Sequence, residues 1–292
     1  MTLSRFQLFS PVGLDEAVAL LKEKGKNTFV MAGGTDLLIK RRHQILHPQT
    51  IVSLKKIAGL NGISFNQKKG LTIGATALLA DVAKHRTILN KYPAIAKAAG
   101  NTANVQIRNM GTVVGNICNA SPAADNAPAL LALNAELNIV GPQGKRVLPL
   151  EDFFIGPGAT ALKPAEIVTS VFVPTPVPAS GATYLHLSAR GRVDCSAAST
   201  GIYLTLKGSR VDNARIFIGA CGPTPMRMPK TEKKLISQKI TNAIAEKAGQ
   251  QASKESKPIS DVRANEDYRS KMVAVLVKRA ILETNQLARN NK

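Results

Sequence analysis

The chain has 292 residues, of which 44% are hydrophobic and 4% aromatic, and its formal net charge is +20. This length exceeds the usual size of one hydrophobic core and predicts two domains. No apolar run approaches the roughly 20 residues of a membrane-spanning helix, and the first residues lack the apolar segment of a secretory signal. We therefore expect a cytoplasmic protein without a membrane span.

The positive charge is spread along the whole chain. Residues 1–176 hold 19 Lys and Arg against 10 Asp and Glu, and residues 177–292 hold 20 against 9. Because the charge is not concentrated, aromatic residues are few and no nucleic-acid motif occurs, we expect no nucleic-acid partner. Two interpretations of the charge stay open: it steers assembly with an acidic partner, or it only keeps the protein soluble.

The three cysteines, Cys118, Cys195 and Cys221, are far apart and form no CxxC pair. This spacing argues against a zinc or iron–sulfur site within the chain and against a disulfide framework. We expect reduced, buried thiols and no metal site.

The first part of the chain, about residues 1–58, has the pattern of a small α/β unit. Short apolar runs predict strands, and a segment with apolar residues every three or four positions, ending at Gly25, predicts a helix. The expected strands are "RFQLF", "TFVMAG" and "TIVSL", and the expected helices are "LDEAVALLKEK" and "DLLIKRR".

The next part, residues 59–176, predicts two β-hairpins, with two helices and a glycine- and asparagine-rich stretch between them, and a further strand. The hairpins turn near Gly70 and Pro142, the helices cover about 78–85 and 93–100, and the strand is "EIVTSVFVP". The segment "PTPVPAS" at 174–180 predicts a linker, because proline donates no backbone hydrogen bond. Beyond it we expect three strands and then helices over about 231–254 and 267–288.

Two glycine-containing loops are the candidate ligand sites. In "FVMAGGTDLLIK", Gly33 and Gly34 precede Thr35 and Asp36. This pattern suits either a strand–turn–helix connection with Thr35 or Asp36 as N-cap, or a loop whose N–H groups bind an anion. The usual dinucleotide and P-loop patterns are absent. The second loop, "GTVVGNICNASPAAD", offers similar small and polar residues, and together the loops suit a ligand with two phosphates.

Four ordered stretches support a more specific interpretation: "AGGTDLL", "LTIGA", "IRNMGTVVGNICNASPAADNAPALLAL" and "DVRANEDYRSKMVAVLVKRAI". Together they resemble the FAD-binding medium subunit of the xanthine dehydrogenase and carbon monoxide dehydrogenase family, the multi-subunit molybdenum hydroxylases. The resemblance implies an α+β fold with a two-subdomain FAD-binding domain of the PCMH type over 1–176 (subdomains about 1–58 and 59–176). A smaller C-terminal domain over 177–292, with a three-stranded antiparallel sheet and helices, would follow.

The resemblance also implies a function. The chain would be an oxidoreductase subunit that takes electrons from 2Fe-2S clusters of a small partner subunit and passes them from FAD to NAD or another acceptor. A large partner subunit would hold the molybdenum cofactor, in a dimer of heterotrimers, and this chain would contain no catalytic residue of its own. The alternative is a self-sufficient flavin-dependent oxidoreductase with a related FAD domain, although no His/Tyr/Arg cluster is visible over 177–292.

The resemblance further implies which residues contact FAD. Residues 30–37 would surround the pyrophosphate, residues 112–116 would form a second loop, and Asp125 would accept a hydrogen bond from a ribitol or ribose hydroxyl. The resemblance gives weaker support for three single contact positions, Thr102, Leu162 and His186. His186 stands where the family often has Lys, so a half-exposed histidine without ligand contact remains an alternative there. The implied contacts are Val30, Met31, Ala32, Gly33, Gly34, Thr35, Asp36, Leu37, Thr102, Thr112, Val113, Val114, Gly115, Asn116, Asp125, Leu162 and His186.

Overall fold

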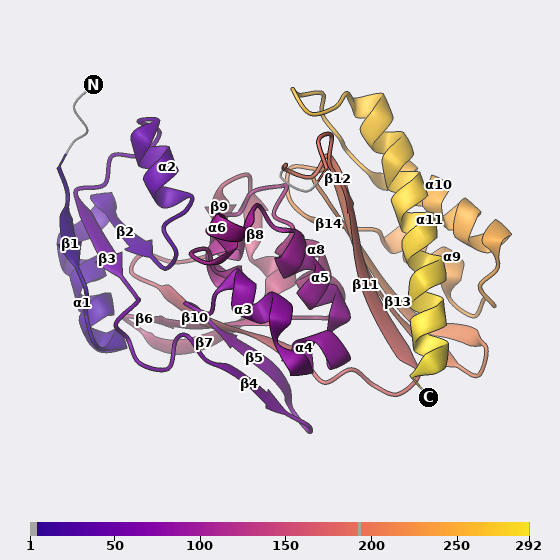
Figure 1. Ribbon diagram of the computed structural model, residues 1–292, viewed down its shortest axis with the longest axis horizontal. Helices are drawn as coiled ribbons and strands as arrows, with labels where there is room; N and C mark the ends of the chain where they lie inside the picture. The colour runs from indigo at the N-terminus through magenta and orange to yellow at the C-terminus, as the bar shows by residue number, and fades with distance from the viewer. Residues whose placement is uncertain (1–4, 192–193, 292) are drawn as a thin grey trace.

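The computed structural model describes residues 5–191 and 194–291. Its first part is a three-stranded parallel sheet in the order β1-β3-β2 (Figure 1). The apolar face of α1 is buried through Ala17, Val18 and Leu21, and Gly25 ends this helix with a φ of 71°, which glycine adopts without strain. The elements are β1 (Gln7–Phe9), α1 (Leu14–Lys24), η1 (Gly25–Asn27), β2 (Thr28–Met31), α2 (Leu37–Arg42) and β3 (Thr50–Ser53). All five elements expected here are confirmed.

The second part is a five-stranded antiparallel sheet in the order β4-β5-β10-β6-β7. Both expected hairpins and the strand at 167–174 are confirmed. Its strands are β4 (Ile63–Asn66), β5 (Gly70–Gly74), β6 (Glu136–Gly141), β7 (Gly144–Pro149) and β10 (Ile167–Pro174). After β7 come η2 (Leu150–Asp152) and a small hairpin of β8 (Phe154–Gly156) and β9 (Ala159–Thr160).

Six helices cover one face of this sheet (Figure 1). The sequence pattern predicted α3 and α5, and the apolar residues that follow Asp125 also indicated α8. The glycine- and asparagine-rich stretch contains α6 and α7, which are too short to show a helical period. The helices are α3 (Leu79–Lys84), α4 (Arg86–Lys91), α5 (Pro93–Asn101), α6 (Val105–Arg108), α7 (Val113–Cys118) and α8 (Asn126–Ala132).

The third part is an antiparallel sheet in the order β11-β12-β13-β14, followed by three helices. The expected count of three strands is wrong by one, because the two-residue β14 pairs with β13. The expected helix over 231–254 is two helices, since Ser237 has a φ of 63° and its N–H donates to Val211 of β13. The elements are β11 (Ser180–Leu187), β12 (Ala198–Lys207), β13 (Arg210–Gly219), β14 (Met226–Arg227), α9 (Pro229–Leu235), α10 (Asn242–Glu255) and α11 (Glu266–Asn290).

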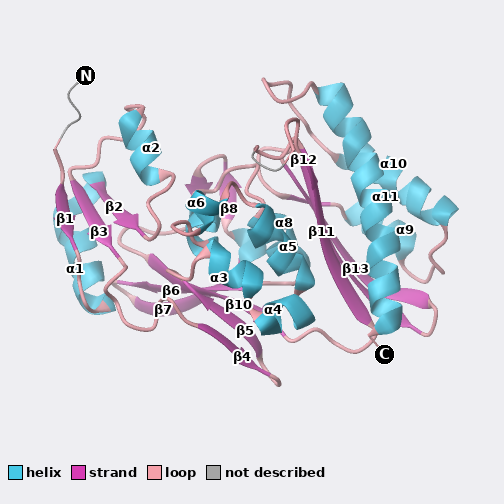
Figure 2. Cartoon of the chain, in the orientation of Figure 1, coloured by secondary structure: helices cyan, strands magenta, loops and turns pink. Residues whose placement is uncertain are grey.

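The layers meet at α8. Helices α3 to α8 lie between the five-stranded sheet and the C-terminal sheet, and α10 and α11 lie on the other side of the C-terminal sheet (Figures 1 and 2). All residues of α8 are buried. Its backbone contacts β12 directly, because a Cβ on Gly201 would lie 2.1 Å from the Pro128 carbonyl oxygen. The start of α8, at Asp125, is thereby held at the junction of the two parts.

Three further observations bear on the sequence-based expectations. The proposed domain boundary at 176/177 falls between β10 and β11 and stays a prediction. Cys221 is buried as expected and Cys118 is half-buried, whereas Cys195 is exposed, so the expectation of buried thiols is wrong for Cys195. Among the described helices, none has the length and apolar character to cross a membrane.

Candidate functional site

The loop between β2 and α2 exposes a run of backbone donors. Within the described chain, the N–H groups of Gly33, Gly34, Thr35 and Asp36 donate no hydrogen bond, while Gly34 and Asp36 carbonyls accept from Leu38 and Lys40. Backbone N–H groups without a partner are uncommon in folded proteins unless water or a ligand pairs with them. Successive N–H groups of this kind are well suited to bind an anion.

The first loop packs directly on the second loop. A Cβ on Gly33 would lie 2.3 Å from the Met110 carbonyl oxygen and 2.8 Å from the Cα of Gly111, which is impossibly close. Gly34 has a φ of 76°, a conformation that side-chain-bearing residues rarely adopt. The two loops predicted from the sequence are therefore brought together, and Gly33 is needed for their contact with each other.

The second loop is organised by Thr112, the N-cap of α7. Its Oγ1 accepts a hydrogen bond from the Gly115 N–H (2.9 Å), and its carbonyl oxygen accepts one from the Asn116 N–H (3.0 Å). The N–H group of Val114 donates no hydrogen bond within the described chain, as is usual in the first turn of a helix, whereas Val113 follows Thr112 in its antiparallel bridge with Leu78. One more backbone donor, the Val114 N–H, is thus left without a partner beside the first loop.

Asn119 joins the two loops through side chains. Its Nδ2 donates to Asp36 Oδ1 (3.0 Å), and its Oδ1 accepts from Lys40 Nζ (2.6 Å). Asp36 is the N-cap residue of α2, in agreement with one of the two interpretations of the loop, but its side chain makes no capping hydrogen bond. Although Asp36 as a residue is exposed, partial desolvation raises the pKa of its carboxyl, and the charge of Lys40 opposes this. No sequence motif marked Asn119, because its partner lies 83 positions away.

Asp125 lies in a buried hydrogen-bond network that crosses to the C-terminal sheet. It is 7% exposed, and its Oδ1 accepts hydrogen bonds from the Tyr184 hydroxyl (2.7 Å) and the Ser196 hydroxyl (2.6 Å). His186 Nδ1 lies 3.2 Å from Ser196 Oγ, and its ring is stacked on Tyr184 with centroids 6.0 Å apart. Sequence analysis did not identify Ser196, and only the pairing of β11 with β12 brings it here.

Burial shifts the pKa values of Asp125 and Tyr184 in this network. Desolvation raises the pKa of Asp125, and the hydrogen bonds from Ser196 and Tyr184 and the charge of His186 act in the opposite direction. Burial and the neighbouring Asp125 also hold the pKa of Tyr184 well above its usual value. Tyr184 is therefore neutral near pH 7, and its hydroxyl donates a hydrogen bond to Asp125 Oδ1.

Asn126, the next residue, connects two more of the predicted positions. It is 1% exposed, and its Nδ2 donates to Thr102 Oγ1 (3.1 Å) and to Asn116 Oδ1 (3.0 Å). Its Oδ1 has no hydrogen-bond partner within the described chain. An unpaired buried acceptor costs roughly 1–3 kcal/mol, so this oxygen is suited to accept from a group that the chain does not supply.

The remaining predicted positions lie around this centre. Val30 is partly exposed at the end of β2, Leu37 begins α2, and Leu162 packs against the N-terminal hydrophobic core. Within the described residues, no hydrogen bond joins Leu162 to the two loops or to Asp125. The hairpin of β8 and β9 is attached near the second loop, because Gly158 N–H donates to the Ala120 carbonyl oxygen (2.9 Å).

Comparison with known protein families shows to which family the chain belongs. Residues 4–176 match the FAD-binding domain in molybdopterin dehydrogenases, and residues 183–284 match the C-terminal domain of the carbon monoxide dehydrogenase flavoprotein. The chain belongs to the FAD-binding medium subunits of the carbon monoxide dehydrogenase and xanthine dehydrogenase family. The expected family, α+β fold, FAD cofactor and class of oxidoreductase subunit are thereby confirmed.

Similar proteins cover this medium subunit almost end to end. The carbon monoxide dehydrogenase medium chain of Hydrogenophaga pseudoflava is 29% identical over 95% of this chain and 96% of its own length. The glyceraldehyde dehydrogenase medium chain of Sulfolobus acidocaldarius is 31% identical over 92% and 95%. A solved structure of the Hydrogenophaga pseudoflava carbon monoxide dehydrogenase superposes with a TM-score of 0.93, at 29% identity and 99% coverage of both chains.

The residues of this medium subunit fit FAD. A pyrophosphate needs hydrogen-bond donors, and the N–H groups of Gly33 to Asp36 donate no hydrogen bond within the described chain. Sugar and ribityl hydroxyls need acceptors, and Asn126 Oδ1 is a buried acceptor without a partner. The chemistry of the donor and acceptor groups therefore agrees with the family's cofactor.

Proposed function

We propose that this medium subunit is the electron-transfer flavoprotein of a molybdenum hydroxylase. It takes electrons from 2Fe-2S clusters of a small partner subunit and passes them to NAD or another acceptor, while a large partner subunit holds the molybdenum cofactor. The three subunits assemble as a dimer of heterotrimers in the cytoplasm. The observation that carries the proposal is the run of unpaired N–H groups in the first loop, packed beside the second loop of an FAD-binding fold.

In this proposal the chain binds and orients the cofactor. The N–H groups of Gly33 to Asp36 bind the pyrophosphate, the loop of residues 112–116 covers the cofactor, and Asp125 accepts a hydrogen bond from one of its hydroxyls. Thr102, Leu162 and His186 complete the surroundings. Bound FAD supplies the redox chemistry, because flavins exchange electrons both singly and in pairs. The chain then needs no acid–base pair for breaking substrate bonds.

The relatives favour a shared electron-transfer role with different substrates. Medium chains similar to this one belong to enzymes named for carbon monoxide, glyceraldehyde and nicotine, and one solved relative lacks the Mo-pyranopterin moiety of its molybdenum cofactor. Because one fold serves such different substrates, we propose that the large subunit determines which substrate is oxidised.

Absorbance spectra of the purified chain, alone and with its partner subunits, test the proposal. We expect flavin absorbance from the isolated chain, or after addition of FAD, and iron–sulfur absorbance only from the complex. In the complex, substrate should bleach the flavin band under anaerobic conditions, whereas the isolated chain should not respond. A chain that is colourless in every preparation and is not reconstituted by FAD would overturn the proposal.

A further inference from the structure

A groove lined by lysine side chains lies between α9 and α10 in the C-terminal part. Its volume is about 330 Å³, and Lys234 of α9 and Lys247 and Lys254 of α10 line it. All three lysines are exposed. The spacing of Lys247 and Lys254 is about two helical turns, so both lie on one face of α10. The rest of the described lining is uncharged and consists of three glutamines and Ile244.

The lysines of this groove have no partner within the described chain. No ion pair and no hydrogen bond joins the Nζ atom of Lys234, Lys247 or Lys254 to another described residue. By contrast, the Nζ atom of Lys278, on the neighbouring α11, pairs with Glu246. Positive charges that share one surface without counter-charges repel one another, and a negatively charged partner relieves this repulsion. The groove is therefore suited to bind anionic groups.

The acidic residues of the two helices have partners outside the groove. α9 and α10 contain three of them, Glu232, Glu246 and Glu255. Glu232 pairs with an arginine of β14, and Glu246 pairs with a lysine of α11. Glu255 accepts hydrogen bonds from two N–H groups in the first turn of α9 (2.9 and 2.7 Å). None of these carboxylates is therefore left to neutralise the lysines of the groove.

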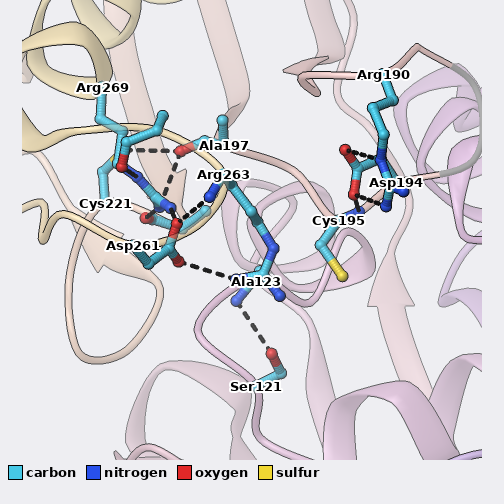
Figure 3. Close-up of polar contacts among 12 residues, drawn as sticks. Ser121, Ala123, Arg190, Asp194, Cys195, Ala197, Cys221, Asp261, Arg263 and Arg269 are labelled. Carbon is cyan, nitrogen blue, oxygen red and sulfur yellow. Dashed lines mark hydrogen bonds and ion pairs between the residues drawn. The ribbon is translucent and has the colours of Figure 1, made fainter.

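Acidic residues of two other segments in the C-terminal part are also paired (Figure 3). In the connection between α10 and α11, Asp261 pairs with Arg263 (2.9 Å) and with the buried Arg269 (2.5 Å). In the segment before β12, Asp194 pairs with Arg190 (3.1 Å). Arginine holds a carboxylate firmly, because its planar guanidinium can donate several hydrogen bonds. These acidic groups are thus not available to the lysines between α9 and α10.

We propose that the groove between α9 and α10 docks an acidic segment of the large partner subunit. The inference rests on the proposed function, to which it adds the surface and the chemistry of one subunit contact. A lysine ammonium group donates up to three hydrogen bonds, and a glutamine amide both donates and accepts. Side chains of Asp and Glu would therefore pair with the lysines, and the backbone of an extended segment would pair with Gln250 and Gln251. Half-buried Ile244 offers an apolar contact.

The position of the groove favours the large subunit. In the proposed function the small subunit passes electrons to the flavin, so it has to lie close to the loops of residues 32–36 and 112–116. Helices α10 and α11 lie on the other side of the C-terminal sheet from α3 to α8, away from these loops (Figures 1 and 2). A subunit that occupies the groove is therefore not the one that meets the flavin.

The lining of the groove favours a protein partner over a nucleic acid. Sites for single strands combine positive charge with aromatic side chains on which bases stack, and no described residue of the lining is aromatic. Opposite charges on two proteins accelerate their association, and salt weakens this effect. Because the Debye length falls from about 10 Å at 0.1 M to about 3 Å at 1 M ionic strength, the contribution of the groove should be largest at low salt.

The test measures how fast the flavin-loaded, full-length chain associates with a purified complex of the large and small subunits, at about 0.05 M and about 0.5 M NaCl. The groove variant carries Lys234→Glu, Lys247→Glu and Lys254→Glu together. We expect it to associate about tenfold more slowly than the wild type at the lower salt concentration and within about twofold of the wild type at the higher one. Circular dichroism and flavin content verify that the variant retains its fold.

Two control variants separate the groove from the net charge of the chain. Lys26→Glu, Lys68→Glu and Lys69→Glu together change the net charge equally, at exposed lysines outside the C-terminal part, and this variant should associate within about twofold of the wild type. Replacing the three lysines of the groove by arginine keeps their charge and should preserve the wild-type rate. Equal slowing of the groove variant and the charge-matched control would overturn the inference, and so would a wild-type rate in the groove variant.

Carbodiimide cross-linking of the assembled complex identifies the occupant, because this reagent joins a lysine amine to a carboxylate in direct contact. We expect cross-links from Lys247 or Lys254 to Asp or Glu residues of the large subunit, and cross-links to the small subunit alone would overturn the inference. A fluorescent single-stranded oligonucleotide that binds the wild type at physiological salt but not the groove variant would also overturn it. Failure of the proposed function is distinguishable, because the wild-type chain would then carry no flavin in any preparation.

Discussion

The first loop and Asp125 prepare one site in opposite ways. The loop of residues 32–36 is half-exposed, and its N–H groups from Gly33 to Asp36 have no partner within the described chain. Asp125 is 7% exposed, and Oδ1 already accepts two hydrogen bonds from the C-terminal part. The loop contributes free backbone donors, whereas Asp125 contributes a buried acceptor whose hydrogen-bond donors, Tyr184 and Ser196, come from the C-terminal part.

The two regions therefore depend on different parts of the chain. The shape of the loop follows from two glycines and their contact with residues 110–111. The environment of Asp125 follows from the packing of α8 on β12, at residues 198–207. Substitutions can therefore disturb one region and leave the other intact. Those at the α8–β12 contact should cause the largest loss of free energy.

Gly201→Ala should break the buried region most severely. The new Cβ would lie 2.1 Å from the Pro128 carbonyl oxygen and 2.3 Å from its carbon, and backbone atoms cannot move aside as a side chain can. We expect a loss of about 3 kcal/mol or more in the free energy of unfolding, measured by chemical denaturation. Gly156→Ala is the control, because the nearest atom to its new Cβ is 3.9 Å away. Equal stability of the two variants would contradict the observed packing.

The sequence could predict the structure of the first loop but only part of the surroundings of Asp125. The strand, the glycines, Thr35, Asp36 and the helix all lie within residues 28–42, so a local pattern was sufficient to predict this strand–loop–helix structure. The family resemblance indicated Asp125, but its partners Tyr184 and Ser196 come from segments paired by the antiparallel register of β11 and β12. Asn119 and Asn126 were missed because an asparagine that joins two loops has no characteristic spacing.

The fold shows the same limit. Strands and long amphipathic helices were predicted from their periods, whereas α6 and α7, of four and six residues, are too short to show one. The break between α9 and α10 was missed because Ser237 adopts its left-handed conformation for a contact with β13. Tertiary packing determines this contact, and the local sequence contains no turn residue that would predict it.

Gly33→Val should break the first region while the buried region survives. Its Cβ would lie 2.3 Å from the Met110 carbonyl oxygen, so the loops would separate and the backbone donors would lose their arrangement. We expect loss of flavin from the purified protein with a circular dichroism spectrum like that of the wild type. Gly34→Asn is the milder comparison, because Asn tolerates a positive φ and the neighbouring atoms belong to the flexible Met31 side chain. Stoichiometric flavin in Gly33→Val would show that this loop does not hold the pyrophosphate.

Asp125→Ala should weaken FAD binding by an intermediate amount. The substitution removes the proposed acceptor for a cofactor hydroxyl and leaves the Tyr184 and Ser196 hydroxyls without their partner. The expected cost is about 1–3 kcal/mol of binding free energy, measured by titrating apo-protein with FAD. Asp125→Asn, which keeps an acceptor oxygen but no charge, should lie between Ala and the wild type. An unchanged dissociation constant in Asp125→Ala would exclude the contact.

Asp36→Ala should have the smallest effect, because the side chain makes no capping hydrogen bond to α2, and within the described residues its one hydrogen bond is to Asn119, at the surface. We expect a loss of about 0.5–1 kcal/mol in FAD binding. Asn119→Ala should cost more, since Asn119 also accepts from Lys40 and is the side chain that joins both loops. The double variant should then be no weaker than Asn119→Ala alone, because Asp36 would already have lost its partner. Fully additive losses in FAD titrations would mean that Asp36 acts on the cofactor independently of Asn119.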